Sequence, residues 1–143
     1  MTNSEKKAYL RQYGDNEREI KRLEEELARW VSRAEKITTS YSLAPAHGES
    51  GDKIQVAVEN ITEVKSMLYD RLIDASELRQ NIQAAIGSVQ DGRLRNLLEY
   101  RYIDALGWDD VAQKMGYDRR WVTSLHGAAL NVIGLQAQPF YSH

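Results

Sequence analysis

Two long segments of this chain carry apolar residues at a period of 3.5, and this pattern constrains the fold more than any other feature. The first segment extends from about Ser4 to Thr38. Its stripe consists of Tyr9, Tyr13, Asn16, Ile20, Leu23, Leu27, Trp30, Ala34, Ile37 and Tyr41. Heptad spacing of this kind keeps one stripe of a helix facing a partner helix. The segment is therefore predicted to be a long helix that packs against another.

The second segment extends from about Lys53 to Val89 and has the same period. Its stripe is read as Ile54, Val58, Ile61, Lys65, Leu68, Leu72, Ala75, Arg79, Ile82, Ile86 and Val89, with Val64 and Leu78 beside the two cations. Both predicted helices are about 50 Å long at 1.5 Å per residue. Equal lengths around one break favour an antiparallel hairpin. Because a two-helix hairpin buries little surface on its own, we also expect self-association through these helices.

Residues 39–52 separate the two heptad segments. Serine, glycine and proline cluster there and no period is present, which predicts a flexible loop. Ser50 and Asp52 are the candidate N-caps of the helix that follows.

A third helix is predicted from about Arg93 to Leu106, because Gln90-Asp91-Gly92 ends the second helix and caps the third. Its apolar face consists of Leu94, Leu97, Leu98, Tyr102 and Ile103. Gly107 ends this helix. Asp109 and Asp110 then lie in the first turn of the next helix, where carboxylates favour the positive end of the helix dipole.

Residues 107–130 have the spacing of a helix-turn-helix. Ala112 is small enough for two helices to cross closely, and Gly116 suits a turn that needs a positive φ. The predicted packing positions are Val111, Ala112, Met115, Gly116, Val122 and Leu125. Asp118 is placed to cap the last helix, which is expected to end near Ile133.

The predicted fold is all-α: a long antiparallel helical hairpin or coiled coil, followed by a small three-helix helix-turn-helix domain. The predicted domains are an assembly region over residues 1–90, the helix-turn-helix over 91–134 and a tail over 135–143.

Composition narrows the range of functions. The chain has 143 residues, no cysteine and a net charge of −2, so disulfides and thiolate metal sites are excluded. Residues 91–143 hold six basic and six acidic residues, which argues against strong DNA binding by a single copy. No apolar stretch reaches membrane-spanning length, so we expect no membrane partner and a place in the cytoplasm. His47, His126 and His143 lack ligand spacing, and no catalytic constellation is present. We therefore expect no enzyme activity, metal or cofactor.

The C-terminal third resembles the fourth conserved region of bacterial sigma factors. The residues that carry this resemblance are Leu97-Leu98-Glu99-Tyr100-Arg101-Tyr102-Ile103, Trp108-Asp109-Asp110-Val111-Ala112 and Met115-Gly116-Tyr117. The whole chain also resembles short phage-encoded proteins with a helical hairpin, a Ser/Gly/Pro-rich loop and a C-terminal pattern. That pattern is present as Arg120-Trp121-Val122, Leu125-His126-Gly127 and Ala129-Leu130. Similarity to phage regulators of late gene expression implies a role in transcription, with the start of the last helix facing the major groove.

This chain differs from sigma factors where recognition would occur. Thr123, Ser124 and Ala128 stand where such helices usually carry more basic residues, which implies few phosphate contacts. Arg120 stands where primary sigma factors tend to have an acid, so their promoter preference does not transfer.

The candidate DNA-binding residues are Arg119, Arg120, Thr123, Ser124 and Lys114. Arginine can pair bidentately with guanine, and hydroxyl groups reach base edges or phosphates. A solvated helix face is the alternative for all of them. Arg95 is a further candidate for contact with the DNA backbone. Trp121 and His126 fit packing roles better.

Three functions are compatible with these residues. The first is a phage or prophage transcriptional regulator that binds double-stranded DNA as a homo-oligomer. The second is a scaffold that binds RNA polymerase or another phage component without DNA. The third is a DNA-packaging adaptor similar to a small terminase subunit.

Overall fold

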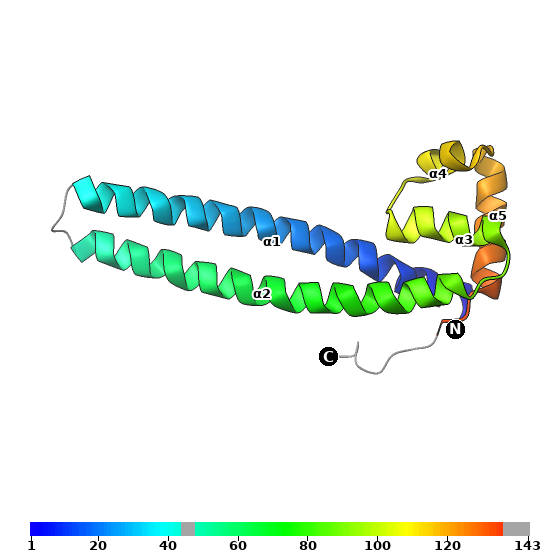
Figure 1. The fold of residues 1–143 in the computed structure, drawn as a ribbon, viewed down its shortest axis with the longest axis horizontal. Coiled ribbons are helices and arrows are strands. Elements are labelled where there is room, and N and C mark those ends of the chain that lie inside the picture. The colour runs from blue at the N-terminus through cyan, green and yellow to red at the C-terminus, as the bar shows by residue number, and fades with distance from the viewer. Residues whose placement is uncertain (44–47, 136–143) are drawn as a thin grey trace. The chain divides into compact units, whose positions relative to one another are not determined.

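The computed structural model describes residues 1–43 and 48–135, and its regular elements are all helical (Figure 1). These elements are α1 (Asn3–Leu43), α2 (Gly48–Gly87), α3 (Gly92–Leu98), the π-helix η1 (Glu99–Ile103), α4 (Trp108–Met115) and α5 (Arg119–Val132). The prediction of an all-α protein is confirmed. Within the described ranges, no helix is both long and apolar enough to span a bilayer.

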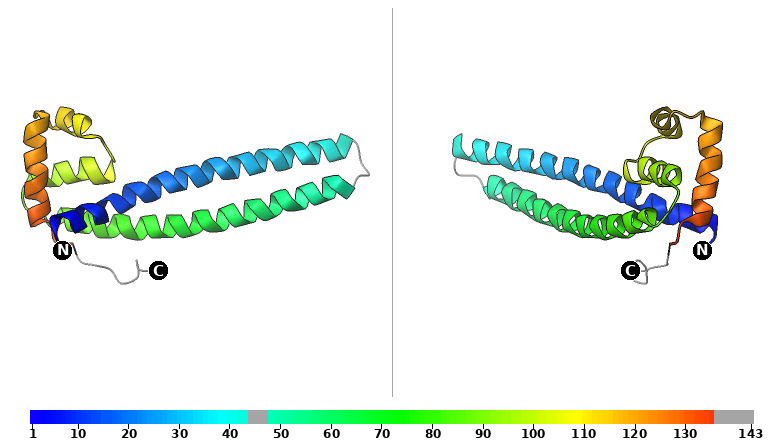
Figure 2. Two further views of the ribbon diagram at one scale, coloured as in Figure 1. Left: turned by 180° about the vertical axis from the view of Figure 1, so that it is seen from behind. Right: turned by 45° about the vertical axis from the view of Figure 1, so that its right-hand side comes forward.

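Contacts divide the chain into two compact units. One consists of residues 16–74, and the other of residues 1–15 together with 75–143, of which 136–143 lie outside the description. In residues 16–74, the α1 and α2 segments lie side by side and run antiparallel (Figures 1 and 2). The predicted tail over 135–143 lies almost wholly outside the described residues.

The apolar stripe predicted on α1 is confirmed wherever its side chains are described. Its buried members are Tyr9, Tyr13, Asn16, Ile20 and Leu23, and its half-buried members are Leu27, Trp30, Ala34 and Ile37. Asn16 is the one polar member, and its Nδ2 donates a 3.4 Å hydrogen bond to the carbonyl of Arg71. Tyr41 lies outside the described side chains. The 3.5-residue period therefore identified the packing face of α1 correctly.

The stripe predicted on α2 is wrong at alternate positions. Lys65, Arg79, Val58 and Leu72 are exposed, the last two by 52% and 45%. The buried positions are Ala57, Val64, Ala75, Leu78, Ile82 and Ile86, with Ile54, Ile61 and Leu68 half-buried. The observed stripe has the same period but passes one residue earlier at Ala57, Val64 and Leu78. This register keeps two cations out of the interior, where an unpaired charge is costly.

The break between α1 and α2 is shorter than the predicted loop over 39–52. Helix α1 continues to Leu43 and α2 begins at Gly48, so only residues 44–47 lie outside the described helices. Ser50 and Asp52 therefore lie inside α2 and are not its N-caps. The physical reason is that extending an existing helix is much easier than nucleating one, so weak helix formers at its ends are tolerated.

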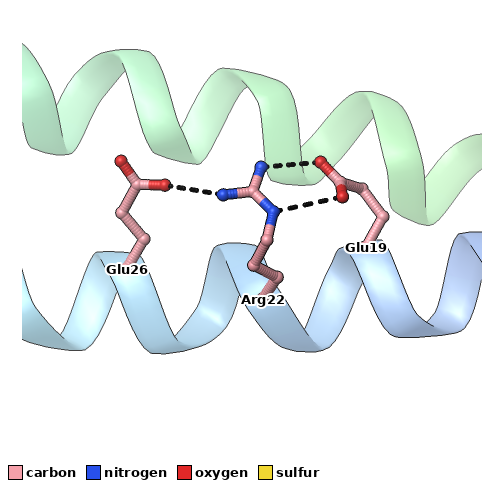
Figure 3. A network of polar contacts seen from close by, with 3 residues as sticks. All are labelled: Glu19, Arg22 and Glu26. Carbon is pink, nitrogen blue, oxygen red and sulfur yellow. Dashed lines mark hydrogen bonds and ion pairs between the residues drawn. The ribbon is translucent and has the colours of Figure 1, made fainter.

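Charged side chains on the solvated face of α1 pair with one another. The Arg22 guanidinium donates to Glu19 at 2.8 Å and to Glu26 at 3.3 Å (Figure 3). The hydrogen bond from Arg22 holds the pKa of Glu19 below its usual range. Pairs one helical turn apart on an exposed face contribute little to stability. We therefore interpret this network as a solvated helix surface.

The other unit combines the C-terminal helices with the first turns of α1. Helix α5 packs against α3 and α4 around Leu97, Leu98, Val111 and Val122, all fully buried. From α1, Lys6 Nζ donates to the carbonyl oxygen of Leu130 at 2.7 Å, so the N-terminus is tied to the end of α5.

The predicted single helix over Arg93–Leu106 is divided. After α3 the chain continues as η1, and Ala105 then takes a φ of 58° before α4 begins. The Asp91 carboxylate caps α3 by accepting from the Arg93 backbone N–H at 2.9 Å. The side-chain pattern predicted the helical face but contained no signal for the π-helical turn.

Candidate functional site

The segment from α4 to α5 turns sharply at Gly116. This residue has φ 72° and ψ 29°, in the left-handed region that glycine adopts without steric cost. The Tyr117 backbone N–H donates to the carbonyl of Ala112 at 3.1 Å and closes the turn. The prediction of a positive φ at Gly116 is confirmed.

The residues predicted to pack α4 against α5 lie mainly in the interior. Val111, Ala112, Val122 and Leu125 are buried, and Met115 is half-buried. Ala112 is 7% exposed and belongs to α4, which packs against α5. A longer side chain at this position would have little room.

Helix α5 begins with a side-chain cap. The Asp118 carboxylate accepts a 2.9 Å hydrogen bond from the Trp121 backbone N–H, as the sequence predicts. This acid therefore satisfies an otherwise unpaired donor of the first turn. Asp109 and Asp110 lie in the first turn of α4, also as predicted.

All five candidate DNA-binding residues are exposed: Lys114, Arg119, Arg120, Thr123 and Ser124. They differ in what they contact. Arg119 Nη1 lies 3.1 Å from Asp109 Oδ1, and Thr123 Oγ1 donates to the Arg119 carbonyl at 3.0 Å. In the part of the chain that the structure covers, no hydrogen bond or ion pair is found for the side chains of Lys114, Arg120 and Ser124. The start of α5 therefore presents one engaged and one free arginine.

His126 is an interior residue of this unit and cannot contact a ligand at the surface. Its Nε2 is hydrogen-bonded to the Tyr102 hydroxyl at 2.7 Å, and its ring packs on Trp108 with centroids 4.6 Å apart. Arg101 covers the Trp108 ring at 4.4 Å. The signal was present in the sequence, because His126 follows Val122 and Leu125 on the apolar face of α5.

The surroundings of His126 keep it neutral. Burial, and to a smaller extent the positive charges of Lys7, Arg101 and Arg11, lower its pKa from 6.5 to about 4. Burial also raises the pKa of Tyr102, so this hydroxyl stays protonated. The pair is uncharged near pH 7, which suits a structural role in the interior.

Arg95 also has a structural role. Its guanidinium donates to the carbonyl oxygens of Val89 at 2.7 Å and Gln90 at 2.8 Å, just after α2 ends. These bonds satisfy two backbone acceptors in the link between α2 and α3. Arg95, a candidate for contact with the DNA backbone, therefore bonds within the chain instead.

Trp121 lies among the candidate DNA-binding residues at the start of α5. Its side chain is 46% exposed, so the described chain covers it only in part.

Comparison with known proteins adds no relative. No family model, curated protein or solved structure matches the chain. Over residues 1–43 and 48–135, histidine and carboxylate side chains form no group of three that could hold a metal ion.

Proposed function

We propose that this chain is a phage or prophage transcriptional regulator that binds double-stranded DNA through a helix-turn-helix formed by α4 and α5. The observation that carries the proposal is the start of α5, where Arg119 and Arg120 are exposed while Val122 and Leu125 are buried. A second helix whose N-terminal residues face away from the interior is the element that enters the major groove in such domains. The glycine turn between the helices supports the same assignment.

The charge balance favours an assembled form. Lys114, Arg119 and Arg120 are offset by Asp109, Asp110 and Asp118, so one copy offers little net positive charge to a duplex. Joining modules raises the effective concentration of the second binding event. We therefore propose that α1 and α2 form a hairpin that assembles copies of the chain. Exposed apolar residues of α2, including Tyr69, Leu72 and Ile73, are available for this contact.

Equilibrium binding to duplex fragments of the encoding genome tests the proposal. The wild-type chain should bind a subset of fragments more tightly than random duplex, with an affinity that falls as salt rises. The double substitution Arg119→Ala and Arg120→Ala should weaken binding without changing the helical circular dichroism. Arg29→Ala removes another exposed arginine from residues 16–74 and should leave binding unchanged. Equal affinity for genomic and random duplex at low salt would contradict the proposal.

A protein-binding scaffold is the second candidate function. The exposed Trp121 favours it, because tryptophan is enriched at the centres of protein interfaces. RNA polymerase recovered with the chain from nuclease-treated lysate, and lost on Trp121→Ala, would support this alternative over DNA binding.

A further inference from the structure

We infer that Arg120 and Ser124 are the specificity-determining residues of α5, and that Arg119 is a positioning residue that Asp109 holds in place. This inference rests on the proposed DNA-binding function and deepens it. It separates the four candidates on α5 into two that face the duplex and two that support the helix.

The side chains of α5 point in different directions around the helix axis. Successive residues are about 100° apart around a helix axis. Val122, Leu125, His126, Ala129 and Leu130 are buried and define the inward direction. Arg120 and Ser124 lie roughly 160° from that direction, whereas Arg119 lies only about 60° from it and Thr123 about 100°. Arg120 and Ser124 therefore point most directly away from the interior.

The two arginines at the start of α5 differ in their contacts. Arg119 Nη1 is paired with Asp109 Oδ1 at 3.1 Å, and the Arg119 carbonyl accepts from Thr123 Oγ1 at 3.0 Å. Arg119 thus links the first turn of α4 to the first turn of α5. Among the described residues, Arg120 has no such partner, so its fork of N–H donors is free for a guanine edge.

Two acids near this surface already have hydrogen-bond partners. The Asp118 carboxylate is engaged by the Trp121 backbone N–H, and that of Asp109 by Arg119. Neither carboxylate is therefore paired with Arg120. Its positive charge is the one that this turn presents to a ligand.

The far end of the outward face is in contact with the first residue of α1. Asn131, which continues the direction of Arg120 and Ser124, accepts a 2.6 Å hydrogen bond from Asn3 Nδ2. Gly127 lies between them, and a Cβ built on it would meet nothing within 4 Å. The face open to a groove is therefore the N-terminal half of α5, where recognition helices contact base edges.

The test uses the full-length chain and the duplex that the wild type selects from a random pool. Each variant is measured on that duplex and on versions with one base pair changed. Arg120→Ala should reduce discrimination at one base pair by about 5- to 150-fold, the range of a bidentate contact. Arg120→Lys keeps the charge but cannot pair bidentately, so it should lose the same discrimination while keeping the salt dependence.

The matched variants at the other arginine should behave differently. Arg119→Ala should lower affinity for all duplexes by a similar factor and keep base discrimination. Arg119→Lys preserves a charge opposite Asp109 and should restore affinity. Asp109→Asn removes the partner that holds Arg119, so it should change affinity for all duplexes by a similar factor and keep base discrimination. Loss of discrimination in Arg119→Ala, or a uniform loss in Arg120→Ala, would overturn the assignment. A wild-type chain that selects no duplex at all would instead refute DNA binding itself.

Discussion

The Nε2 atom of His126 lies 2.7 Å from the hydroxyl oxygen of Tyr102, and this bond joins α5 to the π-helix η1. Both residues are buried, at 8% and 4% exposure. A polar pair inside an apolar shell is stabilising only while both partners remain hydrogen-bonded, because either one alone keeps its desolvation cost. The stability of the C-terminal unit should therefore respond to pH and to the loss of either group.

Acid should destabilise the chain through His126. Its pKa is about 4 in the folded state and about 6.5 when unfolded, so below pH 6.5 the unfolded chain binds the proton first. Stability is fully present above pH 6.5 and is lost as pH falls toward 4. The free energy of unfolding should fall by about 2 kcal/mol between pH 7 and pH 5. Urea titrations at a series of pH values measure this slope.

The control for this prediction is His126→Gln, which keeps a polar group in place but cannot be protonated. Its free energy of unfolding should change much less between the same two pH values, whatever its value at pH 7. If the variant and the wild type lose the same amount, His126 is not the source of the acid sensitivity.

Tyr102→Phe should cost about 1–3 kcal/mol at pH 7, because it leaves His126 Nε2 buried without its partner. Tyr100→Phe is the matched control, since Tyr100 is half-buried and its hydroxyl bonds no residue in the described ranges. That substitution should change stability by less than about 0.5 kcal/mol. Chemical denaturation of the two variants compares them directly, and equal costs would refute the prediction.

Local sequence signals predicted much of the C-terminal unit because each acts within one helical turn. The caps at Asp91 and Asp118 and the positive φ at Gly116 are dictated by a few neighbouring atoms. The burial of His126 is predictable from its place on the apolar face of α5, but its partners Trp108 and Tyr102 come from other elements. No local pattern specifies such contacts.

On α2 the period was predictable but the register was not. Val58 and Leu72 are as apolar as Val64 and Leu78, so two faces of this helix carry hydrophobic side chains. Only packing against α1 selects between them. On the candidate surface, the sequence identified Arg119 and Arg120 but could not distinguish them, because the bond from Arg119 to Asp109 spans two helices.

Replacing Gly116 and Gly127 by alanine should change the stability of the chain in opposite directions. Gly116→Ala forces a side chain into the left-handed region at φ 72° and should cost about 1 kcal/mol. Gly127→Ala places a methyl group in open space within α5 and should stabilise the chain by about 0.5–1 kcal/mol. Thermal unfolding of both variants provides the comparison. A stabilising effect at Gly116 would contradict the turn geometry.

Ala105→Gly should stabilise the chain. Ala105 has a φ of 58°, a conformation that is costly for a residue with a Cβ and free of that cost for glycine. Ala105 is also exposed, so little packing is lost with the methyl group. We expect a gain of about 0.5–1 kcal/mol, after allowing for the greater freedom of glycine in the unfolded chain. The midpoint of urea unfolding should rise, and a lower midpoint would show that this strain is absent.

Two leucines distinguish the buried face of residues 16–74 from its exposed face. Leu23 is fully buried and Leu72 is 45% exposed, although the sequence placed both in packing stripes. Leu23→Ala should cost about 2–5 kcal/mol through lost burial and the cavity left behind. Leu72→Ala should leave the stability of the dilute chain nearly unchanged but weaken self-association, because its side chain is free to contact a second copy. Sedimentation equilibrium over a range of concentrations distinguishes the two effects. If Leu72→Ala associates as tightly as the wild type, the exposed face of α2 is not where copies meet, and another surface has to be sought for assembly.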